Sequence, residues 1–239
     1  MSTPSEPTDP PSSGGVIDRR VLPAAVGLVM ILAAMSGVVD TVAYQRFGVF
    51  VANQTGNLVI VMVDATSGKV TTTLIASLVS LAFFVLGVVG AVALRNFLRR
   101  SMTRHHVRMV LLGVEAFCIA MVAFGVFIFG ESQLAYGAIA LLAVSQGVQG
   151  VVVMRVVGVM VQSVVINTAI VQVADWLSRG YRRAALIAFA VPVGYFLGAT
   201  MGAVLTRLPP PTALVSALVL ALLSLVVAAH LRSRGGDLD

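Results

Sequence analysis

The sequence FGVFVANQTGNLVIVMV, residues 47–63, sets the organisation of the whole chain. Two apolar flanks enclose a five-residue polar block, Asn53 to Asn57. In hydrocarbon, the side chains of Asn, Gln and Thr need hydrogen-bonding partners, and a Gly among them weakens a helix that would otherwise satisfy the backbone. We therefore expect a broken or re-entrant segment that faces a protein-lined cavity.

The composition on either side of this stretch is that of a polytopic membrane protein. Hydrophobic residues make up 58% of the 239 residues and charged residues 11%, and the mean hydropathy is +0.98. The sequence pI is close to 10.4, but the Arg residues cluster in short loops between apolar segments. The positive-inside rule explains this clustering, so we expect the partner to be the lipid bilayer and not nucleic acid.

Six apolar stretches are long enough to cross a bilayer, which takes roughly 20 residues. They are 21–45, 70–95, 107–130, 134–154, 184–206 and 212–231. Two shorter ones, 47–63 and 157–174, each follow one of the six. Residues 1–18 are rich in Pro, Ser, Thr and Gly and are predicted to be a disordered cytoplasmic tail, which leaves 19–239 as a single membrane domain.

The basic linkers favour six crossings over eight. Residues 95–108 and 178–183 are rich in Arg, Arg residues also flank the first and last spans, and the linker 130–133 carries only Glu131. If only the six long stretches cross, all the basic segments and both termini are cytoplasmic. The segment 47–63 then enters from outside and 157–174 from inside.

An internal repeat is consistent with this topology. The shift along the chain that places Gly37 on Gly147 also places Asn57 on Asn167, and later glycines match at almost the same shift. Each half, about 21–130 and about 131–234, then holds three spans and one short segment. An odd number of spans inserts the halves in opposite senses, so we predict an all-α fold with a 3+3 inverted repeat.

Three stretches of the sequence point to a known family: Ser36-Gly37-Val-Val-Asp40, the segment from Phe47-Gly48 to Gln54-Thr55-Gly56-Asn57, and Val148-Gln149. With these stretches, the chain resembles the YoaK family of bacterial inner-membrane proteins, a domain of unknown function. The resemblance covers nearly the whole chain beyond the tail. It implies an inner-membrane location and no particular substrate. The second half has Val165-Ile166-Asn167-Thr168 where another Thr-Gly element is common in the family.

Polar residues of the two short segments are the candidate substrate-binding residues, because irregular backbone at membrane depth lies in protein or around water. They are Asn53, Gln54, Thr55, Gly56, Asn57, Gln162, Ser163, Asn167 and Thr168. The alternative is that these side chains only tie the segments to neighbouring helices. Gln146 and Gln149, three residues apart, are expected to join helices, and Gly194, Gly198 and Gly202 to permit close helix packing.

Asp40 and Glu115 are the candidate ion-coupling residues, because ionisable groups inside a membrane are costly and usually functional. Asp40 could instead cap the nearby break, and Glu115 could be a neutral acid within the bundle. No hydrolase, kinase or metalloprotease motif occurs, Cys118 is the single cysteine, and we predict no enzyme, metal or cofactor.

The sequence thus predicts a transporter or channel for a small solute, with a midplane polar site formed by the two short segments and with H⁺ or another cation as the coupling partner. A non-transporting membrane scaffold is the alternative, and homo-oligomerisation is left open.

Overall fold

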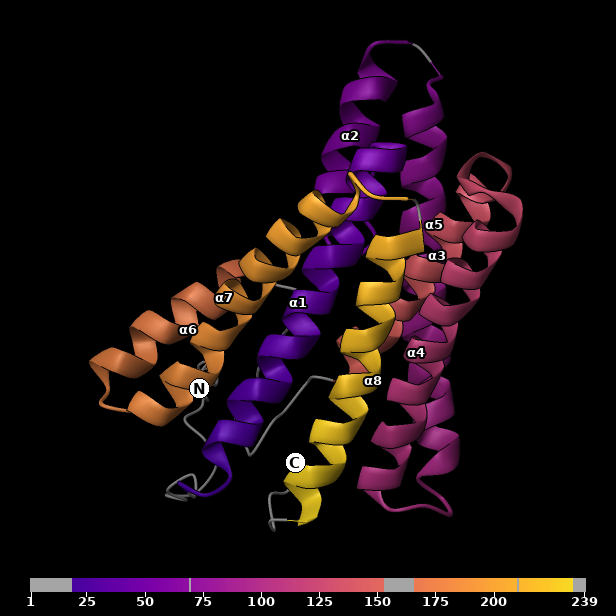
Figure 1. Cartoon of the computed structure of the whole chain (residues 1–239). Coiled ribbons are helices and arrows are strands. Elements are labelled where there is room, and N and C mark those ends of the chain that lie inside the picture. The colour runs from indigo at the N-terminus through magenta and orange to yellow at the C-terminus, as the bar shows by residue number, and fades with distance from the viewer. Residues whose placement is uncertain (1–18, 69, 153–165, 210, 234–239) are drawn as a thin grey trace, which may run out of the picture.

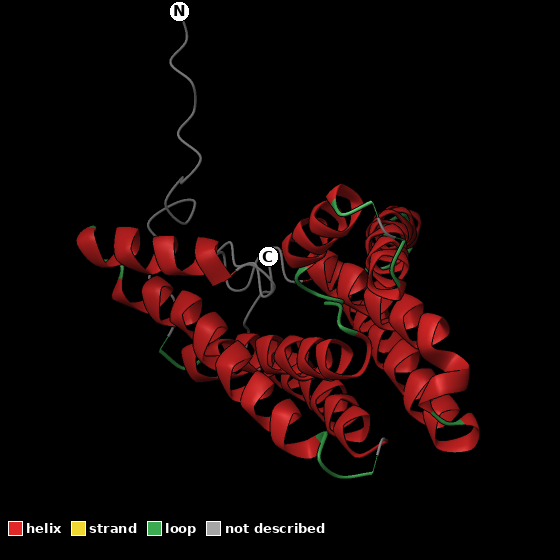
Figure 2. Ribbon diagram, turned by 90° about the horizontal axis from the view of Figure 1, so that it is seen from above, coloured by secondary structure: helices red, strands yellow, loops and turns green. Residues whose placement is uncertain are grey.

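A computed structural model describes residues 19–68, 70–152, 166–209 and 211–233, and all the regular secondary structure within these ranges is α-helix. Figure 1 shows the arrangement of the helices, and all the regular structure drawn in Figure 2 is helix. The helices are α1 (Leu22–Phe47), α2 (Gln54–Thr66), α3 (Thr72–Leu98), α4 (Arg104–Phe129), α5 (Glu131–Val152), α6 (Ile166–Ser178), α7 (Arg182–Leu205) and α8 (Pro211–Ser233).

Six of these helices are long and apolar enough to span a membrane, as the sequence predicts. They are α1, α3, α4, α5, α7 and α8, and their bounds lie within a few residues of the predicted ones. The chain is therefore a multi-pass membrane protein. Helices α2 and α6 have 13 residues each. A helix of that length extends about 20 Å, less than the ~30 Å hydrocarbon core.

The break in the first half precedes the polar block instead of lying within it. Helix α1 ends at Gly48, whose φ of 71° is left-handed and whose N–H donates to Tyr44 O. The chain is irregular from residue 49 until α2 begins at Gln54. The position that we expected for the break is thus wrong, because Gln54 to Asn57 form the first turn of α2 and Asn53 precedes it.

The long helices pair across the two halves of the sequence. Helix α1 packs on α7 and α8, and α5 packs on α3 and α4. The short helices follow the same pattern, with α6 on α7 and α2 on α3. Two groups result, one of α1, α6, α7 and α8 and the other of α2, α3, α4 and α5. The contacts of α4 with α8 and of α1 with α5 join them.

Close backbone approach between α1 and α7 requires glycine. A Cβ added to Gly198 would lie 1.9 Å from Ala34 O, and one added to Gly37 would lie 2.3 Å from Tyr195 O. Neither position has room for a methyl group. The predicted close packing along α7 is therefore confirmed, and its partner is α1.

Helices α3 and α5 also approach each other closely at glycines, at positions that are equivalent in the internal repeat. A Cβ on Gly147 would lie 2.4 Å from Phe84 O, and one on Gly87 would lie 2.6 Å from Val144 O. In the internal repeat, Gly147 is the equivalent of Gly37, and Gly198 is the equivalent of Gly87. The repeated glycines thus make matching contacts in the two groups of helices.

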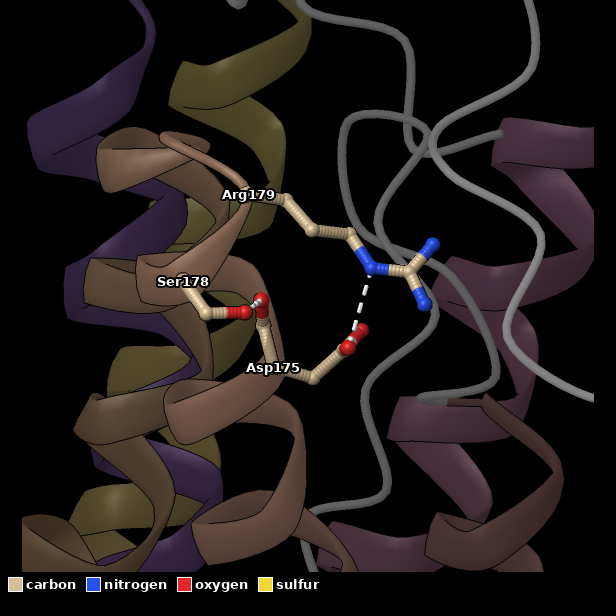
Figure 3. A network of polar contacts seen from close by, with 3 residues as sticks. All are labelled: Asp175, Ser178 and Arg179. Atoms are coloured by element: carbon tan, nitrogen blue, oxygen red, sulfur yellow. Dashed lines mark hydrogen bonds and ion pairs between the residues drawn. The ribbon is translucent and has the colours of Figure 1, made fainter.

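The basic turns lie at one end of the bundle. In Figure 1, the α3–α4 and α6–α7 turns lie towards the end of the bundle where α1 begins and α8 ends. Figure 3 shows the last turn of α6, where Arg179 Nε donates to Asp175 Oδ1 at 2.9 Å and Ser178 Oγ donates to Asp175 O at 2.7 Å. This ion pair is partly exposed, so its contribution to stability is small.

Candidate functional site

Asp40, near the C-terminal end of α1, holds the irregular segment that follows that helix. Because Gly48 reverses the chain direction, three successive backbone N–H groups return to the carboxylate. Val51 N and Ala52 N donate to Oδ1 at 2.7 and 2.6 Å, and Asn53 N donates to Oδ2 at 3.1 Å. The Asp40 side chain is 1% exposed.

A fourth donor reaches Asp40 from α7. Tyr195 Oη donates to Oδ2 at 2.8 Å, so the carboxylate fixes the break and also joins α1 to α7. Four donors engage both oxygens, an arrangement that stabilises a buried carboxylate. This geometry matches the capping role considered from the sequence, while the ion-coupling role of Asp40 stays a prediction.

Asn57 closes the break from the other side. Its Oδ1 accepts from Phe50 N at 2.9 Å, and its Nδ2 donates to Phe50 O at 2.6 Å and to Gln54 Oε1 at 2.8 Å. Ser80 of α3 donates to the same Phe50 O at 2.7 Å, and Gln54 Nε2 donates to Val51 O at 2.8 Å. Gln54 and Asn57 are therefore engaged within the protein.

The remaining polar residues of this block are more accessible. Asn53 and Thr55 are exposed, and Gly56 is half-buried. A Cβ on Gly56 would lie 2.7 Å from the Phe50 ring, which also stacks on Tyr44 with 5.0 Å between ring centroids. The Gly of the Thr-Gly-Asn signature thus makes room for an aromatic ring. No sequence pattern indicated this contact.

The second-half candidates lie elsewhere. Gln162 and Ser163 lie outside the described residues, and Asn167 and Thr168 form the start of α6, where Asn167 is exposed and Thr168 is half-buried. Helix α6 packs on α7 and α2 on α3, at different places in the bundle (Figure 1). Within the described residues, the structure does not bring the two predicted substrate-binding sets together.

A buried polar cluster lies instead where α1 meets α5. This central cluster consists of Ser36, Gln146 and Gln149, all 0% exposed. Ser36 Oγ lies 2.7 Å from Gln146 Oε1 and 2.8 Å from Gln149 Oε1, and Gln149 Nε2 donates to Leu32 O at 2.8 Å. The predicted interhelical role of the two glutamines is confirmed. Our sequence reasoning missed the part of Ser36, although Ser36 and Gln146 occupy equivalent positions in the internal repeat.

Glu115 is a second buried acid within the spanning helices. It lies near the middle of α4, in the buried stripe of that helix, and is 1% exposed. Neither of its carboxyl oxygens has a hydrogen-bond partner among the described residues, and the same is true of Gln146 Nε2. Among those residues, no group of three or more His, Cys, Asp or Glu could hold a metal ion.

Comparison with known proteins places the chain in a family. A family model described as "Protein of unknown function (DUF1275)" matches residues 28–228. No curated protein and no solved structure matches the chain.

Proposed function

We propose that this chain, which belongs to the DUF1275 family, is a small-solute transporter or channel of the bacterial inner membrane. Within that family we group it with the YoaK-like proteins that it resembles. Its partners in this proposal are the lipid bilayer, a small solute, and H⁺ or another cation.

The proposal includes a 3+3 inverted repeat. The pairing of α1 with α7 and α8 has its counterpart in the pairing of α5 with α3 and α4, and α2 on α3 has its counterpart in α6 on α7. Equivalent glycines make the closest approaches in both crossings. Both observations support a pseudo-two-fold relation between residues 21–130 and 131–234. Inverted repeats of this kind are common in secondary transporters.

The observation that carries the proposal is the contact between Ser36 and Gln146. These residues are equivalent in the two halves and lie 2.7 Å apart at their side-chain oxygens, so they mark the place where the halves meet. Polar side chains buried between apolar spans are costly and usually functional. In transporters built from inverted repeats, the substrate and ion sites lie near the midplane at the repeat interface.

The short segments supply the solute contacts in this proposal. Asn53 and Thr55 are exposed at the start of α2, where their polar side chains favour a solute that forms hydrogen bonds. The basic turns at the end of the bundle with the termini support cytoplasmic N- and C-termini. In this orientation α2 lies on the periplasmic side.

A topology measurement tests the architecture. Single cysteines at Thr55, Ser67 and Ser178, in a Cys118→Ser background, are exposed to a membrane-impermeant maleimide in intact cells. We expect Thr55 and Ser67 to react from outside and Ser178 to be protected. Protection of Ser67 together with labelling of Ser178 would reverse the orientation, and the cytoplasmic termini would be refuted.

A flux measurement tests the function. Purified protein in liposomes on a solid-supported membrane is challenged with neutral amino acids, sugars, polyols and small carboxylates. We expect a solute-dependent current that Gln146→Leu abolishes and that Ser216→Ala leaves intact, because the Ser216 hydroxyl donates within its own helix, to Ala213 O.

The alternative function is a membrane scaffold. It is favoured by the internal hydrogen bonds of Asp40, Gln54 and Asn57, which leave these side chains occupied within the protein. Folded protein that carries no current with any solute in the panel, while Asp40→Ala and Asn57→Ala lower its thermal stability, would favour a scaffold over a transporter.

A further inference from the structure

Glu115 is placed at the level of the central polar cluster. Helices α4 and α5 form a hairpin with Gly130 at its turn, and Glu115 and Gln146 are almost equally far from Gly130 along the sequence, on either side of it. At about 1.5 Å per residue, both lie about 22–24 Å from the turn. The hairpin is tight, because a Cβ on Gly125 would lie 2.9 Å from the Leu134 side chain.

The surroundings of Glu115 do not suit a carboxylate ion. A buried carboxylate ion needs several hydrogen-bond donors or an opposite charge. Without them, its burial costs several kcal/mol, so the group binds a proton and becomes neutral instead. Both Glu115 oxygens lack a donor among the described residues, in contrast to the four donors of Asp40. The two acids of the bundle therefore differ in environment.

Cys118, one turn further along α4, is the titratable neighbour of Glu115 on its own helix. Ser224, the buried polar residue near the middle of α8, donates its hydroxyl to Ala221 O. The remaining titratable or charged residues lie nearer to the ends of α4, of its neighbours α5 and α8, and of the adjoining α3. They are Arg95, Arg104, His105, His106, Arg108, Glu131, Tyr136, His230 and Arg232.

A metal cation is a poor fit for this place. Hard cations take six or more oxygen ligands, whereas the unpartnered group at the level of Glu115 is the amide nitrogen of Gln146, which only donates. A carboxylic acid, in contrast, has one donor and one acceptor oxygen and is neutral. A protonated carboxyl group therefore suits this place better than a metal ion does.

We propose that Glu115 is the proton-binding site of this protein, a neutral carboxylic acid at the centre of the bundle whose proton exchanges with water during the transport cycle. The coupling role rests on the proposed transporter function, and the protonation of Glu115 does not. In this proposal Asp40, with its four hydrogen-bond donors, is the structural acid, and Glu115 is the acid that gains and loses H⁺.

Infrared difference spectroscopy tests the proton directly. Protein reconstituted in lipid at neutral pH is compared with Glu115→Gln, which keeps the size of the side chain and removes the acid. We expect a carboxylic-acid C=O band above the amide I region that is lost in Glu115→Gln, kept and displaced in Glu115→Asp, and unchanged in Asp40→Asn. We also expect this band to shift when the sample is moved into D₂O.

Each outcome decides one part of the proposal. Identical spectra of the parent protein and Glu115→Gln in this region would overturn the proposal, and so would a band that never shifts in D₂O, because its proton would be sealed from water. A shifting band in a protein that carries no solute current would uphold the proton site and refute transport. A solute current that is unchanged in Glu115→Gln would refute the coupling role alone.

Discussion

Replacement of Asp40 by Asn tests whether the carboxylate holds the break after α1. The variant keeps one acceptor oxygen for Val51 N–H and Ala52 N–H, while its amide group faces the N–H of Asn53 and the hydroxyl of Tyr195, which can turn to accept from it. Orphaning that N–H costs about 1–3 kcal/mol, and a neutral acceptor weakens each of the two other bonds by about 1 kcal/mol. Relief of the buried charge offsets part of this sum, so we expect a net loss of about 2–4 kcal/mol.

The single cysteine provides the assay. Cys118 is buried, so a thiol-reactive fluorophore reports its exposure when the detergent-solubilised protein unfolds on heating. The expected loss lowers the Tm by at least roughly 4 °C. Asp175→Asn is the matched control, because its partly exposed pair with Arg179 is worth about 0–1 kcal/mol. A Tm for Asp40→Asn equal to that of the control would refute the anchoring role.

Three further substitutions probe the packing. Tyr195→Phe removes one of the four donors to Asp40 and should lower the free energy of unfolding by about 1.5 kcal/mol. Combined with Asp40→Asn, the total loss of stability should be well below the sum of the two single losses. Tm shifts that add up would contradict the contact between the two side chains. Gly198→Ala should cost about 3 kcal/mol or more, because its Cβ would meet Ala34 O at 1.9 Å, whereas Gly90→Ala, with open space around it, should be neutral in the same assay. Gln149→Leu removes two buried hydrogen bonds and should lower stability by about 1–2 kcal/mol, and an unchanged Tm would show that the central cluster contributes nothing to the fold.

The spans could be predicted from the sequence because hydrophobic length alone determines them. A run such as 212–231 has no polar interruption that could place it in water, and it appears as α8. The polar block at 53–57 likewise predicts a break, since its side chains need partners. Its position was missed, because the decisive residue is Gly48, which precedes Gln54 and the whole of α2, and not the Gly within the block.

The site depends on contacts that no local pattern encodes. Asp40 and Tyr195 are far apart in the sequence, and their hydrogen bond exists because α1 packs on α7 and not on the next span along the chain. Ser36 meets Gln146 for the same kind of reason. The repeat offset pointed to equivalent positions but not to their contact, because equivalence within a repeat does not fix which helices cross.

The pairing of α1 with α7 has a consequence for biosynthesis. Helix α1 leaves the ribosome first, yet the Gly198 surface against which Gly37 packs is synthesised only near the end of the chain. At typical synthesis rates this delay is on the order of ten seconds. During that time the first helix must wait in the membrane with its glycine face uncovered and with Asp40 lacking its contact with Tyr195. A chain cut after α4 would therefore leave two fragments, and neither could complete a helix group until the other had been inserted beside it.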